Sequence, residues 1–503
     1  MVAITIPPGV YNAPTPASKS AQWRETNLVR WIEDKLTPVG GWSQLVYDAP
    51  ATRIRKIHRW IDTLGKEWTA YLCEGHLYVD IEGVLTDVSP VDPIVPPYDN
   101  LFAGGYGDFQ YSLDEYGTPR PDKERDYVIA PCFTIDNWGE DLIVMTSVDG
   151  RLLRWKPSTP TAKAVEVPNA PKGRTFVVTP ERFVIVFGAD STPQRFRWCD
   201  QENIENWNLA DVASKAGEFY VEPASPIVSA RRTRGGTIFH TTLGPYFITY
   251  AGMPYVYSYT ALDGGSTPIS EGAIIDTPRG AIWLATGGFW LYNGSSVAPI
   301  PCPVWNWVRE DINVTLSRYY AVAVHLEQTG EVWFFFVSRE GKFNDKFVSY
   351  SYRDGWWSMG KLCRACGLSS TYTNSPIMSD GFKIFRHDYG TQYPDAPEMP
   401  WAETFAINLG GGAGVSTVTQ MVPDIGNDVG SVDFVLYSSL QRSSMNSPAP
   451  EIKSQPRPVR PDGYVDFRQT GRDHRLRIQS RDNGVPNWTF GNCELTIVGR
   501  GTR

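Results

Sequence analysis

The chain is built from repeated pairs of short apolar runs separated by turns. In each repeat an apolar run leads into a Gly- or Asp-containing turn, and a second run follows that ends in aromatic residues, as in DLIVMTSVDGRLLRW from Asp141. Related pairs begin at Trp68, Arg182, Gly236, Ala281 and Tyr320, and a weaker one begins at Ser375. Short apolar runs bounded by turn residues predict β-hairpins, so the pattern predicts an all-β protein.

The spacing of these hairpins indicates a β-propeller. From Asp141 onward their starts lie 41, 54, 45, 39 and 55 residues apart, and a period of about 40–50 residues with a hairpin in each unit is typical of propeller blades. The first interval is 73 residues long, which predicts an inserted Pro- and Gly-rich loop at about residues 89–126. A pair of stacked β-sandwiches is the alternative architecture.

The pattern divides the chain into three parts. We expect an N-terminal arm and entry segment over residues 1–50, a propeller over 51–400, and a C-terminal β-domain over 401–503, most simply a small sandwich. A glycine-rich passage, LGGGAGVSTVTQMVPDIGNDVGS, and strand-like runs such as VDFVLYSSL mark this last domain. Residues 22–36 and 304–318 depart from the strand pattern and predict short helices.

Composition agrees with many short strands. The chain has 42% apolar and 13% aromatic residues, with 45 Gly and 39 Pro, and aromatics fill pleated surfaces while Gly and Pro form turns.

The formal net charge of −8 argues against a dedicated nucleic-acid-binding surface, but it is compatible with a passage through which DNA slides. The start of the chain lacks signal-peptide features, and no run reaches the roughly 18 apolar residues of a membrane span.

No motif in the sequence predicts catalysis, a metal or a cofactor. The six His are dispersed, and no phosphate-binding glycine loop or nucleophile elbow is present. The seven Cys predict reduced thiols buried in β-structure, and Cys363 and Cys366, although they form a CxxC, lack a second pair or a redox context. We therefore expect a protein that is not an enzyme.

Two arginine clusters are the candidate contact residues. The first, predicted in a loop before the strand at Gly236, consists of Arg231, Arg232 and Arg234, and the second consists of Arg472, Arg475, Arg477 and Arg481. They are interpreted either as solvated faces and subunit salt bridges, or as contacts with DNA phosphates or an acidic partner. Arg475 and Arg477 alternate with apolar residues, which places both on one strand face.

Three passages resemble the tail hub or nozzle proteins of short-tailed bacteriophages, also called packaged-DNA stabilisation proteins. NLVRWIEDKLTPVGGWSQL (27–45) is similar to the family's opening. The region from VWNWVREDI (304–312) through EVWFFFVSREGKFNDKFVSYSYRDGWWSMGKLCRACG (331–367) resembles its late-blade pattern, which ends in a W-S-x-G turn. DHRLRIQSRDNGVPNWTFGNCELTIVGRG (473–501) resembles its closing strands. The likeness extends loosely over nearly the whole chain, and none of these motifs is catalytic.

The resemblance implies a propeller with an added β-domain and a ring of copies of this chain, typically six, around a channel. The ring sits in the virion tail, assembled in the host cytoplasm, below the portal and adaptor (head-to-tail connector) proteins. Tail fibre, spike or needle proteins are further implied partners, and double-stranded DNA passes through the channel without sequence preference. A propeller carbohydrate-active enzyme, or a receptor-binding or lectin-like virion module, is the alternative function.

Overall fold

The computed structural model describes residues 2–11, 21–45, 50, 52–96, 130–368, 375–410, 414–427, 431–441, 450–481 and 486–502. The chain forms two compact units, Tyr47–Pro299 and the combination of Met1–Val46 with Ile300–Arg503. We call the first the blade unit and the second the composite unit. Most of the predicted insertion at 89–126 lies outside the described residues.

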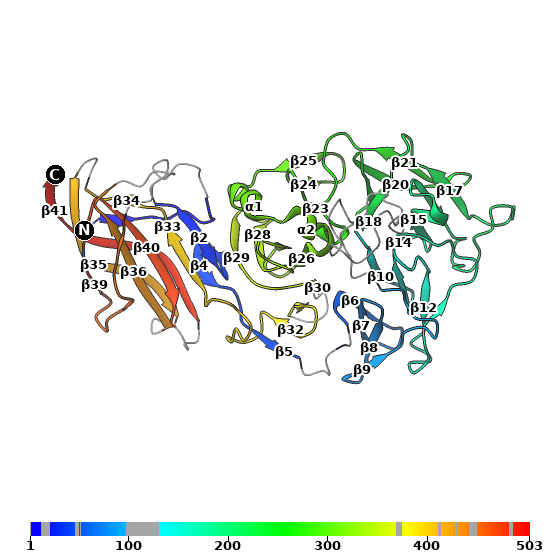
Figure 1. Ribbon diagram of the computed structural model, residues 1–503, viewed down its shortest axis with the longest axis horizontal. Helices are drawn as coiled ribbons and strands as arrows, with labels where there is room; N and C mark the ends of the chain where they lie inside the picture. The colour runs from blue at the N-terminus through cyan, green and yellow to red at the C-terminus, as the bar shows by residue number, and fades with distance from the viewer. Residues whose placement is uncertain are drawn as a thin grey trace, which may run out of the picture. The chain divides into compact units, whose positions relative to one another are not determined.

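In its described residues the blade unit contains five four-stranded antiparallel sheets, each formed by four strands in chain order (Figure 1). The sheets comprise β6 (Ile54–Ile61), β7 (Glu67–Cys73), β8 (Leu77–Ile81) and β9 (Val84–Asp87); β10 (Phe133–Trp138), β11 (Asp141–Thr146), β12 (Leu153–Trp155) and β13 (Val165–Glu166); β14 (Thr175–Val178), β15 (Val184–Phe187), β16 (Arg195–Trp198) and β17 (Gly217–Tyr220); β18 (Ile227–Thr233), β19 (Gly236–Thr241), β20 (Pro245–Gly252) and β21 (Val256–Ala261); and β22 (Ile274–Thr277), β23 (Gly280–Ala285), β24 (Gly288–Tyr292) and β25 (Val297–Ile300). The first strand of each sheet contacts the first strand of the next. These first strands are therefore innermost, and the sheets are propeller blades.

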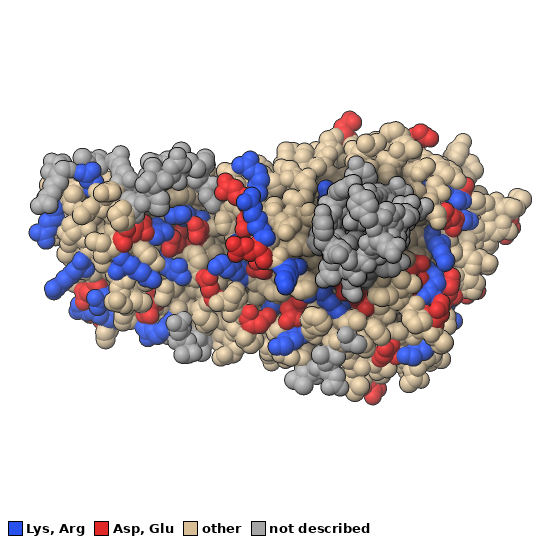
Figure 2. Space-filling model, in the orientation of Figure 1, with Lys and Arg blue, Asp and Glu red and all other residues tan. Residues whose placement is uncertain are grey.

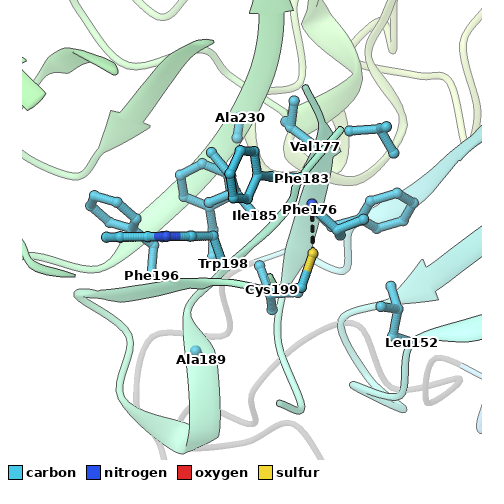
Figure 3. Packing of buried hydrophobic residues seen from close by; sticks show 14 of the residues in the cluster. Leu152, Phe176, Val177, Phe183, Ile185, Ala189, Phe196, Trp198, Cys199 and Ala230 are labelled. Carbon is cyan, nitrogen blue, oxygen red and sulfur yellow. Dashed lines mark hydrogen bonds between the residues drawn. The ribbon is translucent and has the colours of Figure 1, made fainter. Parts of the chain in front are cut away.

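The core of the blade unit lies between neighbouring sheets. In β15 all four residues are buried, and they pack with Phe176, Phe196 and Trp198 from the adjoining strands (Figure 3). Strands that are covered on both faces read as continuous apolar runs, which explains why these blades appear in the sequence without polar alternation. The backbone N–H of Val184 donates a hydrogen bond of 3.2 Å to Cys199 Sγ, so the buried thiol also has a polar partner.

The composite unit contains two further four-stranded sheets. The first is formed by β26 (Val322–Leu326), β27 (Glu331–Phe336), β28 (Lys346–Ser351) and β29 (Trp357–Lys361), and the second by β30 (Cys366–Leu368), β31 (Ile377–Ser379), β32 (Ile384–His387) and β5 (Trp42–Gln44). The last sheet thus takes its outer strand, β5, from the N-terminal segment. Two helices, α1 (Trp305–Asp311) and α2 (Val314–Tyr320), precede β26.

Both ends of the chain build the remaining domain, a β-sandwich. One sheet contains β1 (Val2–Ile4), β3 (Val29–Ile32), β4 (Lys35–Pro38), β41 (Trp488–Thr502), β35 (Gly414–Asn427) and β39 (Val465–Gly471). The other contains β2 (Trp23–Asn27), β33 (Trp401–Thr404), β34 (Ile407–Asn408), β40 (Asp473–Ser480), β36 (Val432–Ser439), β37 (Ile452–Lys453) and β38 (Arg457–Pro458). Phe490 lies between the sheets, with its ring 6.1 Å from that of Trp23 and 6.2 Å from that of Phe434.

The all-β propeller with a C-terminal sandwich is confirmed, and so is helical structure at 304–318, which is split into α1 and α2 where Asn313 caps α2 with its side chain. The predicted helix at 22–36 is wrong, because this segment forms β2, β3 and β4. A two-residue turn with positive φ at Glu33 (51°) and Asp34 (64°) joins β3 to β4, as tight hairpins require.

Residues 1–50, set apart in the sequence as an arm, supply strands to three sheets. Neither α-helix in the described residues has the length or apolarity to cross a membrane.

Candidate functional site: two arginine clusters and a buried clamp

The first cluster lies at the innermost strands of the blade unit, and we call it the axial cluster. Its centre is Glu271, in a short 3₁₀ turn (Glu271–Ala273) before β22. Glu271 pairs with Lys56 of β6, whose Nζ lies 3.1 Å from Oε2, and with Arg231 of β18, whose Nη2 lies 2.9 Å from Oε1. The carboxylate side chain is only 6% exposed. One buried carboxylate therefore joins the inner strands of three blades.

Burial and charge act against each other at this carboxylate. Burial raises the pKa of Glu271, but Lys56 and Arg231 lower it more, so its pKa lies below the ordinary value. Burial and the neighbouring Arg231 lower the pKa of Lys56. Burial also raises the pKa of the nearby Cys132 thiol to about 11. The axial cluster thus holds an ion pair and a protonated thiol, which suit a structural role better than nucleophilic catalysis.

The other two arginines of this group differ from Arg231. The loop prediction is wrong for Arg231 and Arg232, which lie on β18, whereas Arg234 lies in the turn between β18 and β19. Arg232 is exposed and donates a hydrogen bond of 3.4 Å to the carbonyl of Val178. In the part of the chain that the structure describes, no salt bridge involves Arg232 or Arg234. Both guanidinium groups nevertheless act on Asp276, where they lower the pKa of the carboxyl against the larger raising effect of burial.

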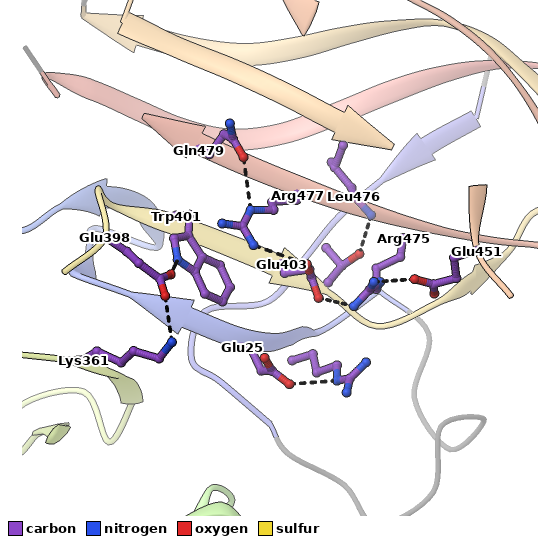
Figure 4. A network of polar contacts seen from close by, with 12 residues as sticks. Glu25, Lys361, Glu398, Trp401, Glu403, Glu451, Arg475, Leu476, Arg477 and Gln479 are labelled. Atoms are coloured by element: carbon purple, nitrogen blue, oxygen red, sulfur yellow. Dashed lines mark hydrogen bonds and ion pairs between the residues drawn. The ribbon is translucent and has the colours of Figure 1, made fainter. Parts of the chain in front are cut away.

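The second cluster lies on the sandwich and is centred on Glu403 of β33 (Figure 4). Arg475 donates to Glu403 and, at 2.5 Å, to Glu451. Arg477 approaches the other Glu403 oxygen at 3.9 Å, and its guanidinium lies 4.0 Å from the ring centre of Trp401. Both arginines come from β40 and face the same carboxylate, as their alternation with apolar residues predicts.

Arg481 and Arg472 complete the second cluster. Arg481 Nη2 lies 2.8 Å from Asp433 Oδ1, and Arg472 is half-buried with its backbone N–H bonded to the Ser439 carbonyl at 2.7 Å. Burial raises the pKa of Glu403, and Glu25 adds to this effect against the lowering by Arg475 and Arg477. Of the seven predicted contact residues, Arg231, Arg475, Arg477 and Arg481 therefore have carboxylate partners within the chain. That they contact DNA or a partner stays a prediction.

A third polar group, which we call the closing clamp, consists of Trp42, Arg364, His387 and Asp395. Arg364 has no exposed surface; it contacts Asp395 Oδ2 at 2.6 Å and donates from Nε to His387 Nε2 at 2.9 Å. Trp42 donates to Asp395 Oδ1 at 2.5 Å and stacks on His387 with the ring centres 4.8 Å apart. Because Trp42 begins β5, the closing clamp fixes the N-terminal strand in the last blade.

Sequence patterns gave no indication of the carboxylates at these sites. Glu271 lies 40 residues after Arg231, and Asp395 lies 31 residues after Arg364, so no local motif connects them. Arg364 lies between Cys363 and Cys366 of the CxxC, a motif in which the thiols are the expected functional groups. All seven Cys are free, and five of them are buried. Among the described residues no three His, Cys, Asp or Glu side chains are grouped so as to hold a metal ion.

No protein-family model matches the chain, and no curated protein does. Among solved structures, virginiamycin B lyase from Staphylococcus aureus is 13% identical with a TM-score of 0.39, over 69% of this chain and 98% of that chain. YCF48 from Cyanidioschyzon merolae is 12% identical with a TM-score of 0.38, over 69% and 99%. PorZ from Porphyromonas gingivalis is 8% identical with a TM-score of 0.36, over 75% and 44%. Similarities this low say nothing of activity, and the propeller assignment depends on the strand topology.

Proposed function

We propose that this protein is a structural virion component, a subunit of the ring that forms the hub or nozzle of a short bacteriophage tail. In this role copies of the chain assemble below the portal and adaptor, retain packaged DNA, and form the conduit for its ejection. The sequence resemblance over nearly the whole chain supports the proposal, and the combination of a propeller with a β-sandwich agrees with it.

The observation that carries the proposal is the path of the N-terminal segment. It supplies β5 to the last blade and β1 to β4 to the sandwich, where β1, β2 and β4 pair with strands from late in the sequence. Main-chain hydrogen bonds across these sheets hold β1 and β4 against β41 and β2 against β33. A subunit that withstands the pressure of packaged DNA needs such reinforcement, whereas a catalytic pocket does not.

The charge distribution agrees with a conduit. Tight binding of many phosphates by free Lys and Arg would hold DNA in place, since each neutralised phosphate strengthens the complex. Four of the seven candidate arginines have carboxylate partners at 3.9 Å or less. Arg232 and Arg234 are the residues we assign to weak phosphate contact.

Negative-stain electron microscopy of the purified protein, alone and mixed with an adaptor ring, tests the proposal. We expect closed rings or short tubes with an axial hole, which stack on the adaptor ring. An unrelated propeller protein of similar mass serves as the control for non-specific stacking. A monodisperse monomer that does not bind the adaptor ring and that cleaves glycans would instead support a carbohydrate-active enzyme and exclude the hub.

A further inference from the structure

A third cation, Arg174, lies beside the axial cluster. Arg174 directly precedes β14; its Nη2 donates a hydrogen bond of 2.6 Å to the carbonyl of Ala130, and its Nε donates one of 3.3 Å to the carbonyl of Val228. The Cys132 thiol lies 3.5 Å from the same Val228 carbonyl. Val228 belongs to β18, so these contacts bring Arg174 to the strand that carries Arg231.

Each sheet of the blade unit contributes one side chain to this region, at or just before its innermost strand. The set consists of Lys56 on β6, Cys132 before β10, Arg174 before β14, Arg231 on β18 and Glu271 before β22. Burial raises the pKa of the Cys132 thiol, and the four charged members of the set all act on it as well. The five side chains therefore share one electrostatic environment, although they come from five different sheets.

Positive charge exceeds negative charge in this environment. Among the described residues, Glu271 is the only carboxylate that forms a salt bridge with Lys56 or Arg231, and Arg174 forms none. Three cations thus face one carboxylate, which leaves an excess of two positive charges when Lys56 is protonated. On the face drawn in Figure 2, by contrast, Lys and Arg side chains often lie beside Asp and Glu side chains. Charges that are largely removed from water are costly unless opposite charge compensates them.

Hydrogen-bond donors also remain unused at this position. Arg231 pairs with Glu271 through Nη2, whereas its Nε has no hydrogen-bond partner among the described residues. The arginine fork carries five N–H donors and matches the oxygens of a carboxylate or phosphate group. The side chains of Lys56 and Arg231 are 16% and 25% exposed, so part of each still contacts solvent.

We propose that the axial cluster, together with Arg174, binds a small oxyanion that carries a phosphate or a carboxylate group. The bound oxyanion compensates the excess positive charge and accepts charge-assisted hydrogen bonds, which are stronger than those between neutral groups. Glu271 stays paired with Lys56 and Arg231 and holds both in place. The inference goes beyond the proposed function, because the site lies within one copy of the chain and needs no assembly.

Isothermal titration calorimetry of the full chain with inorganic phosphate, at an ionic strength kept constant with sodium chloride, measures the binding. We expect one phosphate per chain, and we expect Arg174→Gln to weaken binding at least about tenfold because it removes one of the three cations. The matched control is Arg195→Gln, since Arg195 lies in the same sheet on β16, is 17% exposed and is paired with Glu218. No binding by the wild type, or equal affinity of the wild type and Arg174→Gln, would overturn the inference.

Urea unfolding provides an independent readout and shows whether the variants fold. The midpoint of the wild type should rise with phosphate and then level off, because a ligand that binds only the folded state stabilises it. Phosphate also stabilises proteins by exclusion from their surface, but this effect is common to all variants. Arg174→Lys keeps the charge and should retain more of the saturable rise than Arg174→Gln. A rise without saturation, equal in every variant, would contradict a specific site.

Competition experiments identify the class of the anion. Methyl phosphate and acetate are each titrated against bound phosphate, and the stronger competitor assigns the site to phosphate esters or to carboxylates. A short DNA duplex at the same concentration of phosphate groups should leave inorganic phosphate bound, because the cluster is mostly buried. Displacement of phosphate by the duplex would refute a small-ion site in favour of a DNA contact. Each of these results is obtained with the single chain and leaves the test of the proposed ring unaffected.

Discussion

Glu271 and Glu403 each hold two cationic side chains that come from distant parts of the sequence. At Glu271 these are Lys56 and Arg231, and at Glu403 they are Arg475 and Arg477. Removing one partner from a buried ion pair is costly because the remaining charge stays buried without compensation. At the scale of single residues, the two carboxylates therefore stabilise the fold by neutralising the charge of one lysine and three arginines. The sequence shows no local carboxylate partner for these cations.

The substitution Glu271→Gln tests this at the axial cluster. It keeps the shape of the side chain but leaves Lys56 and Arg231 facing each other without a carboxylate, so we expect the free energy of unfolding to fall by about 3–5 kcal/mol. Urea denaturation measures the change. Glu82→Gln is the control, since Glu82 is 81% exposed and its loss should change little. Equal, small effects of both substitutions would contradict a structural role of Glu271.

The buried histidines predict how stability depends on pH. Burial lowers the pKa of His240 to about 3 and that of His325 to about 4. Because these pKa values lie below the value of about 6.5 in the unfolded chain, the unfolded state binds more protons in acid, and stability is lost as pH falls below about 6.5. From pH 6.5 to 5, His240 alone accounts for about 2 kcal/mol.

Comparing the wild type with His240→Phe isolates this contribution. Urea unfolding midpoints measured between pH 7.5 and 5 should fall less steeply for the variant, whatever its stability at pH 7.5. The other titrating groups are common to both proteins and cancel in the difference of slopes. Parallel pH profiles for the two proteins would show that His240 is not buried in its neutral form.

At the scale of elements, the N-terminal strand β5 has a larger role than its three residues suggest. Trp42 is 1% exposed and contacts His387, Tyr393 and Asp395. Trp42→Ala removes this packing and leaves Asp395 with one donor fewer, so we expect a loss of about 3–5 kcal/mol. The control is Phe382→Ala in the same blade, because Phe382 is 48% exposed. Denaturant unfolding of both variants gives the comparison, and a Trp42→Ala midpoint equal to the control's would contradict the closing clamp.

The blades were predictable from the sequence because their middle strands are apolar on both faces, as β15 is. The segment at 22–36 was not, because it lacks the apolar–polar alternation and the glycine turn that mark a hairpin in a sequence. The decisive feature, the turn at Glu33 and Asp34, contains no glycine. The partners of the arginines were hidden for another reason, since blade topology and not local sequence brings Glu271 to Arg231.

At the scale of the whole molecule, two features bear on the proposed function. The N-terminal segment is shared among three sheets, and four of the seven candidate arginines have carboxylate partners inside the chain. Under the proposed function, the first feature reinforces the subunit and the second leaves few cations for tight contact with DNA.

The mass of the assembled protein tests this most directly. Native mass spectrometry of the full chain, with and without an adaptor ring, should give a discrete species at a whole multiple of the subunit mass of 56.3 kDa, with six copies as the expected number. The adaptor ring should bind this species and leave the number of copies unchanged. A species of 56.3 kDa alone, at every concentration and with the adaptor ring present, would contradict the account.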